Sequence, residues 1–242
     1  MDSPLTAVGL AQADAVARRL ATRRQPPVLP VPVAAPLEIV HSPLSRTAAT
    51  ADRIASAMAM AAAGDVVAAT VPTRPDPGFL EIAQGEWEGL TGAAIAEEYS
   101  ESLGAWRRRP WESVAPGGET LHDVVGRVGP ALARVLGGLA EGRAAGTLDR
   151  SHVAGYGDAA PDHPWSVLVG HDGVFKVALL TLFGLPIERF WMWSMDLCGI
   201  SVVEFRAGRP VLRAHNLTDH LAAMDVAAPA GVVPAARPEG AL

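Results

Sequence analysis

The sequence predicts a layered α/β domain. Short apolar segments of strand length alternate along the chain with longer segments in which apolar residues recur at helical spacing. Polar turns follow several of the apolar segments and lead into the next helix, an arrangement typical of sheets that bind ligands at the carboxyl ends of their strands. The 242 residues can form one full core, and the 24 glycines and 20 prolines indicate several loop-rich segments.

The first half of the chain begins with a helix. Thr6 is a suitable N-cap residue, and apolar residues recur at helical spacing after it, so residues 6–24 are predicted to be helical. The expected elements that follow are an irregular connection at 25–36, a short buried strand at 37–41, an alanine-rich helix at 47–62, a β-branched strand at 65–71, a loop at 72–78 and a short helix at 91–99.

The second half combines a long helix, a buried strand and a hairpin. Ala207 and Gly208 form a hairpin signal between two apolar runs. The expected elements are a helix at 120–139, a surface loop at 141–164, a buried strand at 165–170, a helix at 174–183 and paired strands at 199–205 and 210–215. The alanine- and proline-rich residues 222–242 are expected to be a mobile tail after a domain at 1–221.

Composition excludes several classes of protein. The net charge of −6 argues against a strongly basic nucleic-acid binder. The single cysteine, Cys198, can form neither an internal disulfide nor a thiolate metal cluster. No purely apolar run reaches the length of a membrane span, and the N-terminus lacks the pattern of a signal peptide, so we expect a cytoplasmic protein that binds neither membrane nor nucleic acid.

Two strand ends carry candidate anion-binding side chains. His41 and Arg46 follow one predicted strand, and His171 follows another. Each group precedes a helix, whose N-terminus adds free N–H groups and a positive dipole end. An arginine and a histidine directed at one point there would form a phosphate pocket. Taken singly, each of these residues is explained equally well as a structural or surface residue.

A third segment, residues 79–91, places three carboxylates around Trp87. One of these carboxylates could protonate the leaving oxygen of a phosphate ester if burial raises its pKa. Glu86 and Glu88 are more simply explained as solvated side chains, and Trp87 as a packed one. The chemistry therefore depends on whether these segments occur together in a known order.

In order along the chain, these segments resemble the histidine phosphatase superfamily, also called phosphoglycerate-mutase-like. The matching segments are PLT at 4–6, HSPLSR at 41–46, LEIAQGEWEGLT at 80–91, PGGET at 116–120, VLVGHDG at 167–173 and NLTDHL at 216–221. The third segment is more similar to the small phosphatase branch than to the glycolytic mutases. The resemblance implies a three-layer α/β/α fold with a mainly parallel mixed sheet.

The resemblance also implies a mechanism. In the family, a histidine attacks phosphorus and becomes phosphohistidine, which water then hydrolyses without a metal or other cofactor. By position, Arg46 resembles a pocket arginine that binds the phosphate, Glu81 the proton donor and His171 the second histidine of the pocket. Asp172 stands where a small residue is common, a change that we expect to be tolerated. The implied partner is a small phosphorylated substrate, and the oligomeric state is left open.

One family feature is absent. Family members begin with a central strand that ends in Arg-His-Gly and carries the nucleophilic histidine, and no Arg-His-Gly occurs in the 242 residues. Neither His41 nor His171 is expected to replace it, because the nucleophile must attack in line with the leaving group. Three explanations are open: a start codon placed too far downstream, a form that has truly lost this strand, or a piece of a larger fusion.

The sequence therefore predicts a phosphomonoesterase by family, which as printed is inactive. The alternatives are a non-catalytic protein that binds phosphorylated ligands and a phosphoglycerate-mutase-type transfer enzyme. Without the central strand, its two neighbours would expose apolar side chains and unpaired backbone groups. We expect the isolated chain to be poorly soluble or partly molten for this reason.

Overall fold

The computed structural model describes residues 2–62, 70–145 and 163–225, and the statements below refer to them. The helices are α1 (Ala7–Ala21), α2 (Ser45–Ala62), α3 (Gly92–Glu98), α4 (Ser100–Arg108), α5 (Leu121–Ala145), α6 (Asp172–Phe183) and α7 (Ala222–Asp225). The strands are β1 (Ile39–His41), β2 (Thr73–Pro75), β3 (Val167–Val169), β4 (Ile200–Arg206) and β5 (Arg209–Leu217). Short 3-10 helices are η1 (Pro77–Phe79), η2 (Gly85–Trp87), η3 (Ile187–Met192) and η4 (Asp219–Leu221).

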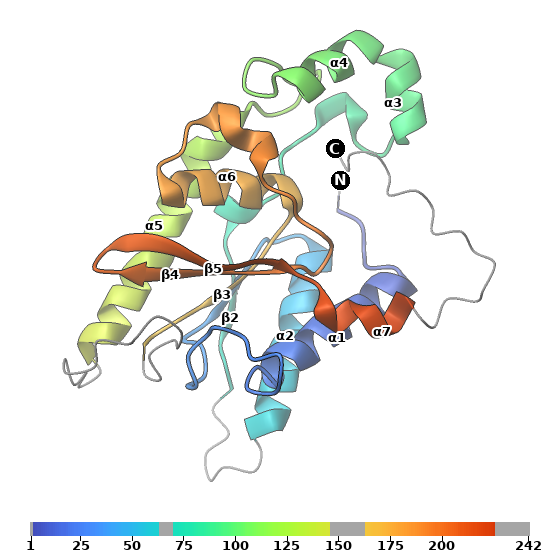
Figure 1. Ribbon diagram of the computed structural model, residues 1–242. Helices are drawn as coiled ribbons and strands as arrows, with labels where there is room; N and C mark the ends of the chain where they lie inside the picture. The colour runs from blue at the N-terminus through green and yellow to red at the C-terminus, as the bar shows by residue number, and fades with distance from the viewer. Residues whose placement is uncertain (1, 63–69, 146–162, 226–242) are drawn as a thin grey trace.

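The fold has three layers, as expected. Helices α1 and α2 cover one face of the strands, and α5 and α6 cover the other (Figure 1). The strand β1 contributes to both cores because successive side chains of a strand point to opposite faces. Ile39 packs with α1 and α2, whereas Val40 packs with α5 and α6. Both side chains are completely buried.

The strands form two separate sheets. In the first, β1 lies between β2 and β3, and both pairings are parallel. Ile39 pairs with Thr73 on one side and with Val167 on the other. In the second sheet, β4 pairs antiparallel with β5. The predicted combination of parallel and antiparallel strands is therefore confirmed, but the two parts are not joined by strand pairing within the described residues.

The helix α1 and the hairpin confirm two local predictions. Thr6 caps α1, and its side-chain oxygen accepts a hydrogen bond from the Gly9 N–H at 3.1 Å. Ala207 and Gly208 have φ angles of 49° and 77°, the left-handed conformation that suits a two-residue turn between twisted strands. The strand predicted at 65–71 falls mostly on residues outside the described part of the chain.

Several boundaries were wrong. The segment 72–78, expected to be a loop, contains β2, which tolerates Pro75 because it lies at the sheet edge. The helix α4 was missed. The helix α5 continues to residue 145, so the expected surface loop cannot begin at 141. Residues 222–225, placed in the tail, form the short helix α7. No helix in the described segments is long and apolar enough to cross a membrane.

The strand β3 is less buried than expected. All three of its side chains are half-buried, although the segment was predicted to be fully buried. By contrast, all three residues of β1 are buried. The difference follows from the pairing, because β1 has a strand on each side and β3 pairs with β1 alone among the described strands.

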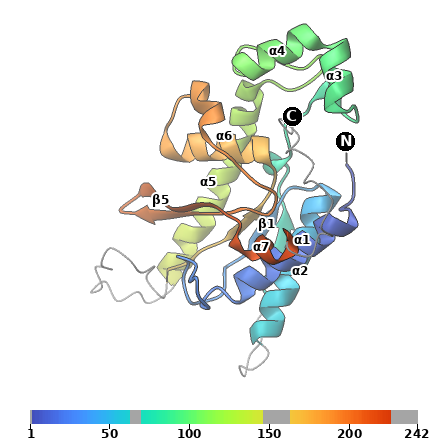
Figure 2. The same ribbon diagram turned by 45° about the vertical axis from the view of Figure 1, so that its right-hand side comes forward.

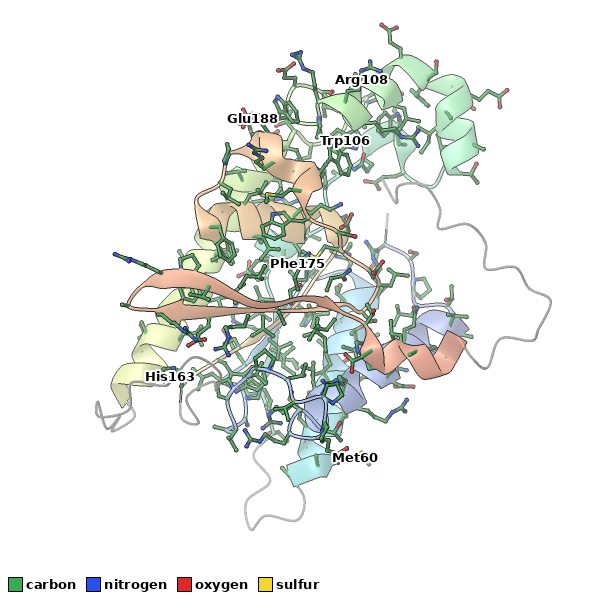
Figure 3. The ribbon with its side chains drawn as sticks, viewed as in Figure 1. Met60, Trp106, Arg108, His163, Phe175 and Glu188 are labelled. Carbon is green, nitrogen blue, oxygen red and sulfur yellow. The ribbon has the colours of Figure 1, made fainter. Side chains whose placement is uncertain are left out.

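The helices α3 and α4 lie together at one end of the molecule, next to α6 and η3 (Figures 1 and 2). Trp106 of α4 is buried and meets Phe190 of η3 edge to face, with ring centroids 6.3 Å apart. Figure 3 shows Trp106 on the side of α4 that faces this segment. The contact fixes the short helices above the sheet.

Two of the sequence segments, residues 80–91 and 116–120, pack against each other through backbone. The Glu86 N–H donates to the Pro116 carbonyl at 2.9 Å, and the Glu119 N–H donates to the Ala83 carbonyl at 2.8 Å. Gly85 lies at this contact with a φ of 51°. A Cβ at Gly85 would lie 2.5 Å from the backbone nitrogen of Gly118. Only glycine fits this position.

We predict that Gly85→Ala lowers the free energy of unfolding by about 2–4 kcal/mol, through left-handed strain and backbone overlap. Gly92→Ala is the matched control, because a Cβ there meets no atom within 4 Å. The control should change the stability by less than about 1 kcal/mol. Urea unfolding measures both variants, and equal effects would contradict the packing argument.

Candidate active site

The parallel pairing of β1 and β3 brings two sequence segments to one edge. Ser42 follows β1 and is completely buried, and its N–H donates to the Val169 carbonyl at 2.9 Å. His171 follows β3, and its Nε2 lies 2.9 Å from the Ser42 Oγ. The carboxyl ends of the two strands therefore meet, as the sequence predicted.

His171 is held as a neutral imidazole. It occupies the N-cap position of α6. Burial lowers the pKa of His171 from 6.5 to about 4, and the positive charges of Arg46 and Arg127 lower it further. At neutral pH the ring can therefore both donate and accept a hydrogen bond. An anion bound beside it would favour the protonated ring and raise this pKa.

The carboxyl of Glu81 is seated on the first turn of α6. Its oxygens accept hydrogen bonds from the N–H groups of Val174 at 3.1 Å and Gly173 at 3.4 Å, and from its own neighbour Ile82 at 2.9 Å. Burial nevertheless raises the pKa of Glu81, because desolvation outweighs these bonds, and the nearby charge of Asp172 acts in the same direction. A carboxyl with a raised pKa is suited to proton donation.

Gly173 makes this seat possible. A Cβ at Gly173 would lie 2.9 Å from the Glu81 Oε1 and 2.6 Å from the Ile82 Cδ1. Any larger residue would therefore displace the carboxyl from α6. The glycine of the predicted His-Asp-Gly turn is required by this close approach.

Arg46 lies in the first turn of α2, directly after the turn that leaves β1. Its charge contributes to the lowered pKa of His171, so the two groups interact electrostatically. The predicted cation, the histidine and the acid thus come from three different elements and converge on the start of α6. No distance between Arg46 and His171 is needed for this conclusion, because the electrostatic effect already requires proximity.

His41 takes the structural role that its position suggested. Its Nδ1 lies 2.8 Å from the Ser42 carbonyl, and the side chain is buried. Trp87 is also buried, as predicted, whereas Glu86 and Glu88 are exposed. The segment 216–221 acts at the end of the hairpin, where the Asn216 Oδ1 accepts from the Asp196 N–H at 2.8 Å.

Arg127 is a site residue that the sequence did not reveal. Its guanidinium donates to the carbonyls of Gly78 at 2.9 Å, Leu80 at 2.8 Å and Glu81 at 3.3 Å. It also binds both carboxylate oxygens of Glu119, at 2.7 and 2.8 Å. Arg127 therefore fixes the backbone on which Glu81 is carried. Its only sequence signal was a single charge in a mainly apolar helix.

A small hollow adjoins the acid. It measures about 40 Å³ and is lined by Glu81, Gln84, Trp106, Asp172 and Trp191, among others. This volume is enough for about one to three water molecules. Lys176 closes the site from within α6, because its ammonium bonds Asp172 at 2.8 Å and lies 4.9 Å from the Trp191 ring centre.

Comparison with known proteins gives one family. The model of the histidine phosphatase superfamily (branch 1) matches residues 1–218. Phosphoserine phosphatase 1 of Hydrogenobacter thermophilus is 25% identical over 189 residues, which cover 76% of this chain and 72% of that protein. Glucosyl-3-phosphoglycerate phosphatase of Mycobacterium tuberculosis is 29% identical over 192 residues, which cover 78% of this chain and 69% of that protein.

Two further comparisons concern length and fold. A bifunctional protein of Mycobacterium tuberculosis is 32% identical over 184 residues, but the match covers only 41% of that protein. This chain therefore spans less than half the length of that relative. The native structure of mycobacterial glucosyl-3-phosphoglycerate phosphatase superposes with a TM-score of 0.68 at 24% identity, covering 90% of each chain. The latter likeness shows a shared fold.

We predict that Arg127→Met lowers the free energy of unfolding by about 2–4 kcal/mol, because Glu119 and three carbonyls lose a partly buried partner. Arg109→Met is the control, since Arg109 pairs with Glu112 on the surface and both side chains are at least half exposed. The control should cost less than about 1 kcal/mol. Chemical denaturation tests this, and a cost for Arg127→Met no larger than the control would contradict the proposed anchoring.

A second prediction concerns pH. The pKa of His171 is lower in the folded protein than in the unfolded chain, so the unfolded chain binds a proton first as the pH falls. The stability that His171 contributes is therefore present above about pH 6.5 and is lost progressively towards about pH 4. We expect His171→Gln to flatten the fall in unfolding free energy over this range. Parallel curves for the two proteins would show that His171 is not buried as described.

Proposed function

Because the chain belongs to the histidine phosphatase superfamily, we propose that it hydrolyses a small phosphomonoester through a phosphohistidine intermediate. The observation that carries the proposal is the seating of Glu81 on the first turn of α6, directly beside the N-cap residue His171. An acid of raised pKa and a histidine thus face the same helix terminus. The named relatives include phosphatases that act on small phosphorylated compounds, which supports this substrate class.

Each residue has a proposed role. Arg46 and His171 bind the phosphoryl oxygens, where negative charge gathers in the transition state. Glu81 donates its proton to the leaving oxygen, and the hollow beside it leaves room on that side. These groups neutralise the phosphoryl charge without a metal ion. Arg127 and Gly173 hold Glu81 in place and do not touch the substrate.

The nucleophile must come from another histidine. His171 flanks the proposed phosphoryl position and its Nε2 lies against Ser42, while His41 is buried against its own backbone. The Arg-His-Gly segment that carries the nucleophile in the family does not occur in the 242 residues. We propose that turnover requires this segment in addition to residues 1–242.

The absence of Arg-His-Gly favours a second candidate, a protein that binds phosphorylated ligands without turnover. Both candidates predict binding of inorganic phosphate, and only the first predicts catalysis once the histidine is supplied. Phosphate binding should raise the pKa of His171 above its value of about 4 in the free protein. Nuclear magnetic resonance of the imidazole nitrogens measures this.

The decisive comparison is between the chain as printed and the same chain extended upstream by an Arg-His-Gly strand. We predict hydrolysis of p-nitrophenyl phosphate by the extended chain and none above background by the printed one. Arg46→Ala in the extended chain should lower kcat/KM by about 100-fold or more. A folded, phosphate-binding extended chain without turnover would overturn the enzyme proposal in favour of the binding protein.

A further inference from the structure

The division of the sheet leaves two strands with a partner on one side only. Within the described residues, β3 pairs only with β1, and β4 pairs only with β5. Edge strands of natural proteins are usually short, charged or covered, because an open edge is a template for another strand. These two edges are apolar, with the sequences VLV in β3 and ISVVEF in most of β4.

The backbone of β3 points half of its hydrogen-bonding groups away from β1. The Val167 N–H donates to the Glu38 carbonyl at 3.1 Å, and the Val169 carbonyl accepts from the Ser42 N–H at 2.9 Å. In a parallel ladder, alternate residues bond to opposite neighbours. The N–H and carbonyl of Leu168 therefore point to the side opposite β1, where none of the described strands pairs with β3.

The side chains of the two edges share one apolar cluster. Val167 and Val169 of β3 and Ile200 and Val202 of β4 all pack against the core formed by α1 and α2. All four are only half-buried, whereas Ile39 in the doubly paired strand β1 is completely buried. The two edges thus border the same core without pairing with each other. Figures 1 and 2 show the hairpin crossing over β3 in both views.

We infer that an extended polypeptide strand docks between β3 and β4 and joins the two sheets into one. Such a strand would bond to the free N–H and carbonyl of Leu168 and cover the half-buried valines. Because apolar cores lie on both faces of β1, an inserted strand needs an almost continuous apolar sequence rather than an alternating one.

The position of Asp2 identifies the occupant as polypeptide joined to the chain before this residue. The carboxylate of Asp2 accepts from the N–H and Oγ of Ser45, at 2.9 and 2.8 Å. Ser45 begins α2, close after the end of β1, so Asp2 is tied to the carboxyl edge of the sheet. A strand that ends near Asp2 would therefore run parallel to β3. With α1 as the crossover to β1, this is a βαβ unit, which is the usual connection between parallel strands.

This inference does not depend on the chemistry, although it deepens the proposed function, because a strand in this position would end at the edge that holds His171. The test therefore uses a strand without histidine. A valine- and isoleucine-rich segment of about six residues is fused before Met1 through a flexible linker of about fifteen residues. The control carries the same fusion with two prolines in the strand, which removes its N–H donors.

Amide hydrogen exchange of Leu168 gives the direct readout, and unfolding midpoints and sedimentation give two others. We expect the fused strand to slow exchange at Leu168 by at least about 100-fold and to raise the unfolding midpoint, with the protein monomeric. The proline control should exchange as fast as the printed chain. Equal exchange in both fusions would overturn the inference. Protection of Leu168 in a dimer of the printed chain would also overturn it, by showing that a second copy fills the site.

Discussion

The parallel pairing of β1 with β3 is the contact on which the rest of the site depends. It brings Ser42 and His171 to one edge and starts α6 at the point where the two strands end. The strand β1 has only three residues, and its burial on both faces holds it between two helical layers. Because the pairing fixes where α6 begins, it also fixes the N–H groups that bind Glu81. A slip of one residue would separate all of these groups.

The acid is placed by a second set of contacts that reach it from outside the sheet. Arg127 of α5 holds three carbonyls of the segment that carries Glu81, and Glu119 holds the guanidinium in turn. Arg127 thereby has two effects on the site. It fixes the acid, and its charge helps to keep His171 neutral. Both effects leave the free site with a neutral histidine, whose protonation would be favoured by an incoming anion.

The sequence predicted the site better than the edges of the fold. Arg46, Glu81 and His171 were found because each lies in a short segment with a distinctive residue order. Arg127 was missed because its partners are backbone carbonyls about 46 to 49 residues away, and no local pattern indicates such contacts. The strand β2 was missed for a similar reason, because its place depends on pairing with β1 and overrides the local signal of Pro75.

The exposure of β3 illustrates the same limit. Its valine-rich sequence predicts burial, and burial in a sheet depends on neighbours that the segment does not encode. The family resemblance supplied that missing information, because it implied a central strand next to β3. The division of the described strands into two sheets, with apolar edges facing one core, agrees with that expectation.

The most direct test of the account is the dependence of Glu81→Gln on the leaving group, measured in the chain extended by an Arg-His-Gly strand. An alkyl phosphate needs a proton on its leaving oxygen, whereas p-nitrophenolate leaves without one. The account predicts that kcat falls by about 100-fold or more for the alkyl ester and much less for the p-nitrophenyl ester, with Glu86→Gln as the exposed control. An equal loss for both esters would contradict the assignment of Glu81 as the proton donor.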